Sequence, residues 1–163
     1  MVAHIPNLLN KGKAMETNLY ETDFYSWTVE QSQFLQSGKF EHLDLINLSE
    51  EIASLGRQER RDLENRLGVL IGHLLKWLYQ PEKLSRSWQV TINAQRREIK
   101  KLLANNPSLK SHLDVVIAEG FIQGLDLVFT ETPLKKKDLP SELPYSQDQI
   151  FDSSFPEDID FEF

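Results

Sequence analysis

The stretch LENRLGVLIGHLLKWLYQP, residues 63–81, decides the fold of this chain. Its leucines recur every three or four residues, which is the spacing of one face of an α-helix. The members of this stripe are Leu63, Leu67, Leu70, Leu74 and Leu78. The helix is expected to end at Gln80-Pro81, because a residue that precedes proline is pushed out of the helical region. The stretch therefore predicts a core helix that is followed by a corner.

A second apolar stripe lies upstream and is out of register with the first. It has the same spacing and comprises Leu45, Leu48, Ile52 and Leu55. The step from Leu55 to Leu63 is one residue longer than the repeat allows, and Gly56 lies at this slip. We therefore expect either two helices that meet near Gly56 or one helix that is bent there. Asp44 precedes the stripe and is expected to be its N-cap.

Helix-end signals place another helix before these stripes. Thr22 is expected to cap a first helix over residues 23–37, because its hydroxyl can accept a hydrogen bond from a free amide of the first turn. Gly38 lies just past the end of this segment, where glycine readily adopts the left-handed conformation.

Two more helices are expected downstream of the corner. One runs from about residue 85 to residue 104, and its apolar face comprises Trp88, Ile92, Ile99, Leu102 and Leu103. The next begins at Pro107, since proline suits the first turn of a helix, and ends near Thr130. The side chains that this helix is expected to bury are Leu109, Leu113, Val116 and Ile117.

The two ends of the chain differ from the bundle expected over residues 15–132. Residues 1–14 match no pattern that follows, so we expect a disordered N-terminal extension before a natural start at Met15. Residues 133–163 contain several prolines and many acids, so we expect a partly irregular acidic tail.

One short helix is expected in that tail, near residues 146–151. Ser146 and Gln149 form a capping-box pair there, in which each side chain can bond the backbone amide of the other residue. Three aromatic side chains are available to dock the tail onto the bundle, namely Tyr145, Phe151 and Phe155.

Four of the seven glycines fall inside expected helices as two spaced pairs, Gly68 with Gly72 and Gly120 with Gly124. Glycine costs about 1 kcal/mol at each helix-interior site relative to alanine, so a packing reason is expected. Pairs with this spacing let helix backbones approach closely in membranes, which here is an analogy only. We hypothesise that these pairs let two backbones of this chain approach closely.

The composition is that of a globular protein whose charge is unevenly distributed. Apolar residues make up 40% of the 163 residues and cysteine is absent, which excludes disulfides and thiolate metal sites. No apolar run approaches the roughly 20 residues of a membrane helix, and no secretory signal pattern opens the chain, so we expect a cytoplasmic protein. The net charge is −7, yet residues 81–110 carry seven lysines and arginines against two acids.

The expected helix over residues 85–104 presents a basic, amide-bearing face opposite Trp88. The residues of this face are Arg86, Gln89, Asn93, Arg97, Lys100 and Lys101. Such a face can bind an acidic partner or the phosphates and base edges of nucleic acid. It is also the face that any amphipathic helix turns to solvent. Gln95 falls within the apolar stripe of the same helix and predicts a buried amide that needs partners.

A polar group is expected beside the corner at Pro81. On a helical wheel His73 lies on the flank of the core face, beside Arg66 and one turn from Trp77. His73 can be an imidazole that packs on the tryptophan edge and bonds the backbone or water, which is the first expectation. It can also be a ligand or acid-base group, or a side chain exposed to solvent.

No catalytic constellation follows from the motifs. His42, His73 and His112 stand on separate segments, without the HExxH or Glu-x-x-His spacing of helical metal sites. There is no GxSxG nucleophile turn and no glycine-rich phosphate loop. The sequence therefore predicts no catalytic residue, no cofactor and no defined metal ligands.

Four blocks of sequence together carry a family resemblance. They are YETDFYSWTVEQ (20–31), LDLINLSEEIASLGRQERRDLENRL (43–67), HLLKWLYQPEKLSRSWQVTINAQRREIKKLL (73–103) and LPSELPYSQDQIFD (139–152). They resemble the bacterial domain-of-unknown-function family number 29, found mainly in photosynthetic bacteria, over about residues 19–153. The resemblance implies an all-helical fold and a bacterial source, and it brings no activity, cofactor or catalytic residue with it.

Together these patterns predict an all-α bundle of about five helices. The first functional expectation is a non-enzymatic protein-interaction module, whose partner is acidic if the basic face binds it. The alternative is a nucleic-acid-associated protein that uses the same face, and the third is a metal-dependent enzyme with histidines between helices. No membrane partner is expected.

Overall fold

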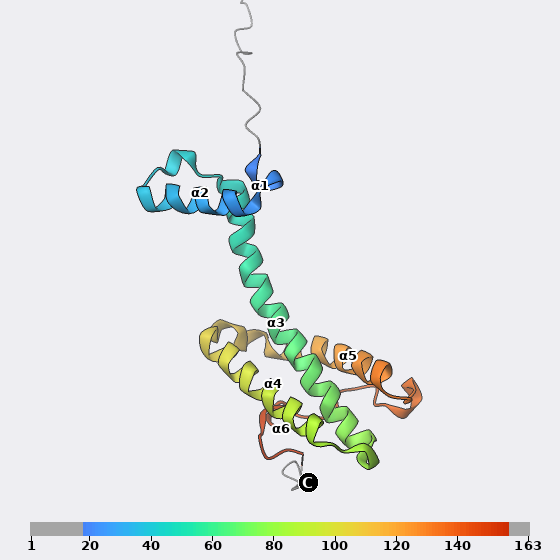
Figure 1. Ribbon diagram of the computed structural model, residues 1–163. Coiled ribbons are helices and arrows are strands. Elements are labelled where there is room, and N and C mark those ends of the chain that lie inside the picture. Colours follow the sequence, from blue (N-terminus) through green and yellow to red (C-terminus); the bar gives the residue numbers. More distant parts are fainter. Residues whose placement is uncertain (1–17, 157–163) are drawn as a thin grey trace, which may run out of the picture. The chain divides into compact units, whose positions relative to one another are not determined.

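The computed structural model describes residues 18–156, and every regular element in that part of the chain is a helix (Figure 1). The α-helices are α1 (Leu19–Thr22), α2 (Phe24–Ser37), α3 (Leu45–Tyr79), α4 (Arg86–Asn105), α5 (Leu113–Glu131) and α6 (Gln147–Phe151). Short 3-10 helices are η1 (Phe40–His42), η2 (Pro81–Lys83), η3 (Pro107–His112) and η4 (Lys136–Asp138). The all-α prediction is confirmed, whereas the extension expected over residues 1–14 lies outside the described residues.

The contacts of the chain divide it into two compact units, with the division between Ala53 and Ser54 inside α3. The described part of the first, residues 18–53, is called the N-terminal unit below. Residues 54–156 are called the C-terminal unit.

A single helix, α3, spans both apolar stripes and the register slip between them. It continues through Gly56 over 35 residues, so the expectation of two separate helices that meet there is wrong. One interior glycine costs about 1 kcal/mol, which is less than the cost of ending a helix and starting another. Asp44 is confirmed as the cap, because its Oδ1 accepts a hydrogen bond from the Asn47 amide at 3.2 Å.

The start of α2 differs from the prediction by one residue. Asp23, and not Thr22, is the N-cap, and its Oδ1 accepts from the Ser26 amide at 3.0 Å. The Thr22 hydroxyl instead donates to the Asn18 carbonyl and closes the short helix α1. Gly38 ends α2 with a φ of 70°, as expected for a left-handed cap.

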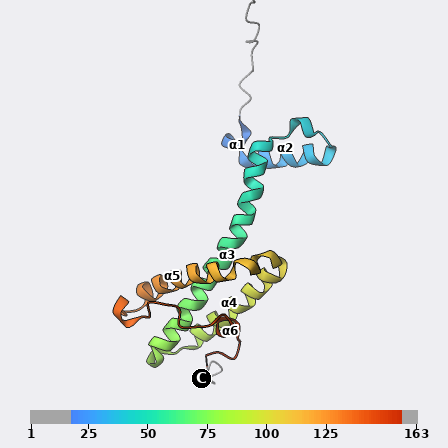
Figure 2. The ribbon, with the colours of Figure 1, turned by 180° about the vertical axis from the view of Figure 1, so that it is seen from behind.

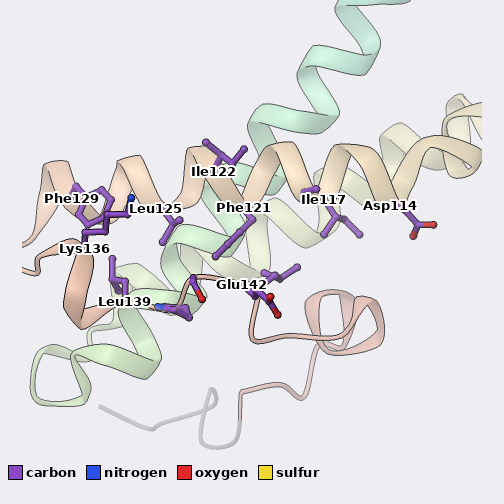
Figure 3. Close-up of a pocket in the computed structure, with 13 residues that line it drawn as sticks. Asp114, Ile117, Phe121, Ile122, Leu125, Phe129, Lys136, Leu139 and Glu142 are labelled. Carbon is purple, nitrogen blue, oxygen red and sulfur yellow. The ribbon is translucent and has the colours of Figure 1, made fainter.

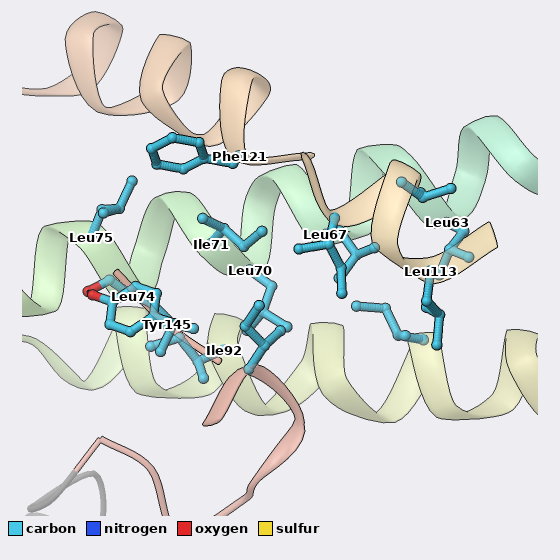
Figure 4. Close-up of a cluster of buried hydrophobic side chains, with 14 of the residues drawn as sticks. Leu63, Leu67, Leu70, Ile71, Leu74, Leu75, Ile92, Leu113, Phe121 and Tyr145 are labelled. Atoms are coloured by element: carbon cyan, nitrogen blue, oxygen red, sulfur yellow. The ribbon is translucent and has the colours of Figure 1, made fainter. Parts of the chain in front are cut away.

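The core of the C-terminal unit forms around the leucine stripe of α3 (Figure 4). Four of the five predicted leucines are buried, whereas Leu78 is 52% exposed near the end of the helix. The helix expected to begin at Pro107 begins instead at Leu113, because the first six residues form the 3-10 helix η3. The residues expected to be buried in this region are buried: Leu109, Leu113, Val116 and Ile117. The buried positions of α4 are Ile92, Arg96, Ile99 and Leu103, so its inner face differs slightly from the predicted one, and Trp88 and Leu102 are half-buried beside it.

The glycine pairs lie where α5 crosses α3 (Figures 1 and 2). A Cβ built on Gly124 would lie 2.9 Å from the amide nitrogen of Gly72, and one on Gly120 would lie 2.9 Å from the Leu67 Cβ. Both distances are shorter than any real Cβ contact, so the two backbones approach too closely for alanine. The hypothesis of close backbone approach is confirmed.

The segment after α5 packs onto the C-terminal unit. The Tyr145 hydroxyl donates to the Leu74 carbonyl at 2.8 Å, and the Tyr145 ring meets Phe155 edge to face. Ser146 and Gln149 form both hydrogen bonds of the predicted capping box. Ile150 of α6 is fully buried and Phe151 packs against the core, so the docking and the short helix are confirmed within the described part of the tail.

No helix among the described residues is long and apolar enough to cross a membrane.

Replacement of Gly124 by alanine is expected to destabilise the C-terminal unit, because the new Cβ meets backbone of α3 that cannot move alone. We expect a loss of about 1–3 kcal/mol in the free energy of unfolding, the usual cost of overpacking. Urea unfolding measures it. Gly56→Ala is the matched control, because its Cβ would meet nothing within 4 Å, and it should stabilise the protein by about 0.5–1 kcal/mol. Equal stabilities of the two variants would contradict the close approach.

Candidate functional site

The predicted basic face is exposed on α4. Its four cationic side chains, Arg86, Arg97, Lys100 and Lys101, are exposed, and Gln89 and Asn93 are half-buried. No hydrogen bond or ion pair joins these cations to another residue in the part of the chain that the structure describes. Their charges are therefore available to a ligand.

Half of this face borders a cleft of about 880 Å³, which we call the basic cleft. Its polar lining comprises Asn93, Arg96, Arg97, Lys100, Lys110 and Ser153. Its apolar lining comprises Ile99, Leu103, Ala104 and Phe151. Four cations line the cleft and no carboxylate does. Arg86, Gln89 and Lys101, from the same predicted face, lie outside it.

Three elements build the basic cleft. The side chains of α4 form one wall, Lys110 comes from η3, and Phe151 and Ser153 come from α6 and the residues after it. A sequence-local pattern finds only the α4 wall. Lys110 and Phe151 join it because the chain folds back on itself, and nothing in their local sequence marks them as lining residues.

Arg96 is a further residue of this site that the sequence did not single out. It is 7% exposed, and its Nε and Nη2 donate to the carbonyls of Ile150 and Gln149 at 2.9 and 3.2 Å. These are carbonyls of the last turn of α6, where a cation also meets the negative end of the helix dipole. Nη1 is buried and has no partner among the described residues.

Burial lowers the pKa of Arg96 to about 10, and the nearby Asp152 carboxylate opposes that shift. The guanidinium therefore keeps its charge at neutral pH. The sequence does contain a signal that could have identified Arg96. Ile92, Arg96 and Ile99 are spaced three or four residues apart, which places the arginine on the buried stripe of α4. A cation in such a position needs carbonyl or anionic partners.

Gln95 is half-buried, and its Oε1 is buried without a partner among the described residues. The sequence predicted a buried amide at this position, and the partner that it needs is not supplied by the described chain.

The corner at Pro81 holds a different polar cluster from the predicted one. Lys76 is buried, donates to Glu131 Oε2 at 2.6 Å, and lies 4.4 Å from the centre of the Trp88 ring. This cation–π contact joins α3 to α4, and the ion pair joins α3 to α5. The hydrogen bond and charge of Lys76 lower the pKa of the Glu131 carboxyl.

His73 is a buried imidazole bonded to the backbone, which agrees with one half of the first expectation, whereas the expected packing on the tryptophan edge is not among the ring contacts of the described chain. Its Nδ1 lies 2.9 Å from the Val69 carbonyl oxygen, which can only accept, so Nδ1 carries the proton of the neutral ring. Burial lowers the pKa of His73, and the Val69 hydrogen bond opposes this shift. Trp77 is buried in the core and Arg66 is half-buried. No hydrogen bond or ring contact in the described chain joins His73 to Arg66 or Trp77.

The three histidines are not gathered into a metal site. No group of three or more His, Asp or Glu side chains among the described residues is placed to hold a metal ion. The His42 ring packs near Phe34 in the N-terminal unit, and His112 is exposed at the end of η3. The idea of a metal-dependent enzyme gains no support from this arrangement.

A second hollow of about 720 Å³ lies between α5 and the segment around η4 (Figure 3). Phe121, Leu125 and Phe129 point into it from α5, and Leu139 faces them from the other side. Its charged residues are Asp114, Lys136 and Glu142, which are of mixed sign. The hollow is therefore apolar and shows no preference for a charged ligand.

Comparison with known proteins gives one result. The family model described as "Domain of unknown function DUF29" matches residues 19–156, which confirms the resemblance seen in the four sequence blocks. No curated protein and no solved structure gives a significant match.

Arg96→Met is expected to loosen α6, because the buried carbonyl of Ile150 and the partly buried carbonyl of Gln149 lose their donor. We expect the free energy of unfolding to fall by about 1–3 kcal/mol, with faster amide hydrogen exchange across residues 147–151. Arg97→Met removes the same charge from an exposed position with no partner, and should change stability by no more than about 0.5 kcal/mol. Similar losses in the two variants would show that Arg96 does not hold α6.

His73 is expected to make stability fall on acidification. Because its pKa is lowered in the folded protein, the unfolded chain takes up the proton first once the pH falls below the ordinary value of 6.5. The stabilisation from the neutral buried ring is thus present above that pH and is lost as the pH falls. His73→Gln removes this titration, so its Tm should fall less between about pH 7 and pH 5. Glu131 titrates at lower pH, and identical Tm profiles of the two proteins would contradict the assignment.

Proposed function

Because the chain belongs to the DUF29 family, which brings no activity with it, we propose from its surface that it is a non-enzymatic interaction module. Its basic cleft binds an acidic segment of a protein partner. The observation that carries this proposal is a concave site lined by four cations and no carboxylate.

Three of the four cations of the cleft have no partner within the described chain. Arg97, Lys100 and Lys110 make no hydrogen bond or ion pair with another described residue. Like charges held close together repel, so a ligand with carboxylates stabilises the cleft as it binds. Arg97 and Lys100 follow α4, which suits a partner that runs along this helix.

The apolar walls of the cleft favour a protein segment over a bare polyanion. Leu103 and Phe151 offer surface that an acidic segment can cover with its own apolar side chains, and this adds to the electrostatic attraction. The lining contains no histidine, aspartate or glutamate, so it offers no side chain that ordinarily exchanges protons near neutral pH. These features support binding and not catalysis.

Nucleic acid is the competing ligand for the same face, and the net charge of the protein weighs against it. A polyanion gains affinity through neutralisation of many phosphates. The whole chain has a net charge of −7, and the cations outside the cleft, Arg86 and Lys101, add two further contacts at most on α4.

A labelled peptide of glutamate and leucine is the probe that tests the proposal. We expect it to bind the full chain, and Arg97→Glu combined with Lys100→Glu should raise its Kd at least tenfold in a fluorescence anisotropy titration. Both side chains are exposed and unpaired, so the fold should persist.

The control exchanges Arg86→Glu and Lys101→Glu, which change the net charge equally on the same helix but outside the cleft. If both pairs of substitutions weaken peptide binding equally, the binding reflects overall charge and not the basic cleft, which would contradict the proposal. A random DNA duplex that binds more tightly than the peptide, with steep weakening between about 50 and 200 mM salt, would favour the nucleic-acid alternative.

A further inference from the structure

The N-terminal unit leaves most of its large apolar side chains in water. The exposed members are Phe24, Tyr25, Val29, Leu35, Phe40, Leu45, Ile46 and Ile52. Trp27 is the one hydrophobic residue of this described unit that is buried. A segment of this size cannot bury enough surface to be stable by itself, and exposed apolar surface on this scale marks an interaction site.

A groove of about 520 Å³ lies within this unit, and we call it the acidic groove. Trp27 and Phe34 supply its aromatic walls, while Glu30 and Asp44 supply carboxylates. No lysine or arginine lines it. Phe24 is 48% exposed and stacks on Trp27, with ring centres 5.5 Å apart, so an exposed apolar side chain lies directly beside the groove.

The two carboxylates of the groove have different roles. Asp44 accepts hydrogen bonds from Asn47 and from the Trp27 indole at 3.3 Å, and the Asn47 bond lowers the pKa of the Asp44 carboxyl. It therefore fixes the wall of the groove. Glu30 makes no hydrogen bond or ion pair with another described residue, so its charge is free to pair with a ligand.

The charge of the whole unit restricts what can cover it. Residues 18–53 contain one lysine, Lys39, against seven carboxylates: Glu21, Asp23, Glu30, Glu41, Asp44, Glu50 and Glu51. An excess of six negative charges repels nucleic acid, an anionic membrane surface and a second copy of the same unit. A covering partner must therefore combine positive charge with apolar surface.

We propose that the acidic groove of the N-terminal unit is a docking site for a basic, apolar segment of a partner protein. One lysine or arginine of that segment lies against the half-buried Phe34 ring and pairs with Glu30. Cations prefer the faces of aromatic rings, and a partly enclosed carboxylate strengthens the attraction. An apolar neighbour in the partner covers Phe24. This site is separate from the basic cleft and takes a ligand of opposite charge.

The probe is a labelled peptide of lysine and leucine. The peptide of glutamate and leucine is the control of opposite charge. We expect the full chain to bind the lysine peptide, and Phe24→Ser combined with Glu30→Lys to raise its Kd at least tenfold. Val29→Ser combined with Glu21→Lys is the matched control, because neither residue lines the groove and the net charge changes equally. This control should change the Kd less than twofold.

Four results would overturn the proposal. The first is binding that the control weakens as much as the test variant does. The second is binding lost in the variant of the basic cleft, Arg97→Glu with Lys100→Glu. The third is a dimer in analytical ultracentrifugation that Phe24→Ser with Glu30→Lys abolishes, since it would make a second copy the occupant. The fourth is a large gain in affinity when residues 1–14 are removed, since it would make that segment of the chain the occupant.

Discussion

The contact between the backbones of α3 and α5 is the constraint on which the C-terminal unit depends. Four glycines in two helix interiors cost roughly 4 kcal/mol relative to alanine, so the contact that they allow must offset this cost. The Gly124 carbonyl oxygen lies so close to Gly72 that a Cβ there would be 3.1 Å from it. At such a crossing the flanking side chains of both helices interdigitate at short range, which is why Leu67 and Ile71 are fully buried.

The basic cleft follows from this crossing by two further steps. α4 is fixed to α3 by the core and by the contact of Lys76 with Trp88, and α6 is then fixed to α4 by the two hydrogen bonds of Arg96. Arg96 therefore has two roles. It satisfies carbonyls at the end of α6, and it adds a charge to the cleft that it borders. The site and the stability of the fold consequently share a residue, so a variant of Arg96 cannot separate binding from folding, whereas variants of Arg97 and Lys100 can.

Local sequence signals predicted most of the helices and several of their ends, but not the contacts between them. The capping box at Ser146, the left-handed Gly38 and the leucine stripe each depend on residues within one or two turns, and each was predicted from them. The ion pair of Lys76 with Glu131 joins residues 55 positions apart, and no pattern near either residue specifies the other. The buried face of α4 differs from the predicted one because Gln95 and Arg96 are adjacent and both polar. Periodicity alone does not decide which polar residue turns inward, and α6 decides it by supplying carbonyls to Arg96.

Charge is segregated along this chain in a way that periodicity also does not explain. An amphipathic helix needs polar residues on its outer face, but either sign of charge satisfies that need. In α4 the outer charges are mostly positive, whereas in the N-terminal unit they are mostly negative. A surface with both positive and negative side chains would be equally soluble, and its charges would repel one another less. Two surfaces of opposite sign, each with apolar side chains beside the charges, are suited to two different ligands. The two ligands proposed for these surfaces therefore carry opposite charges, and each makes its contacts with residues of a single unit.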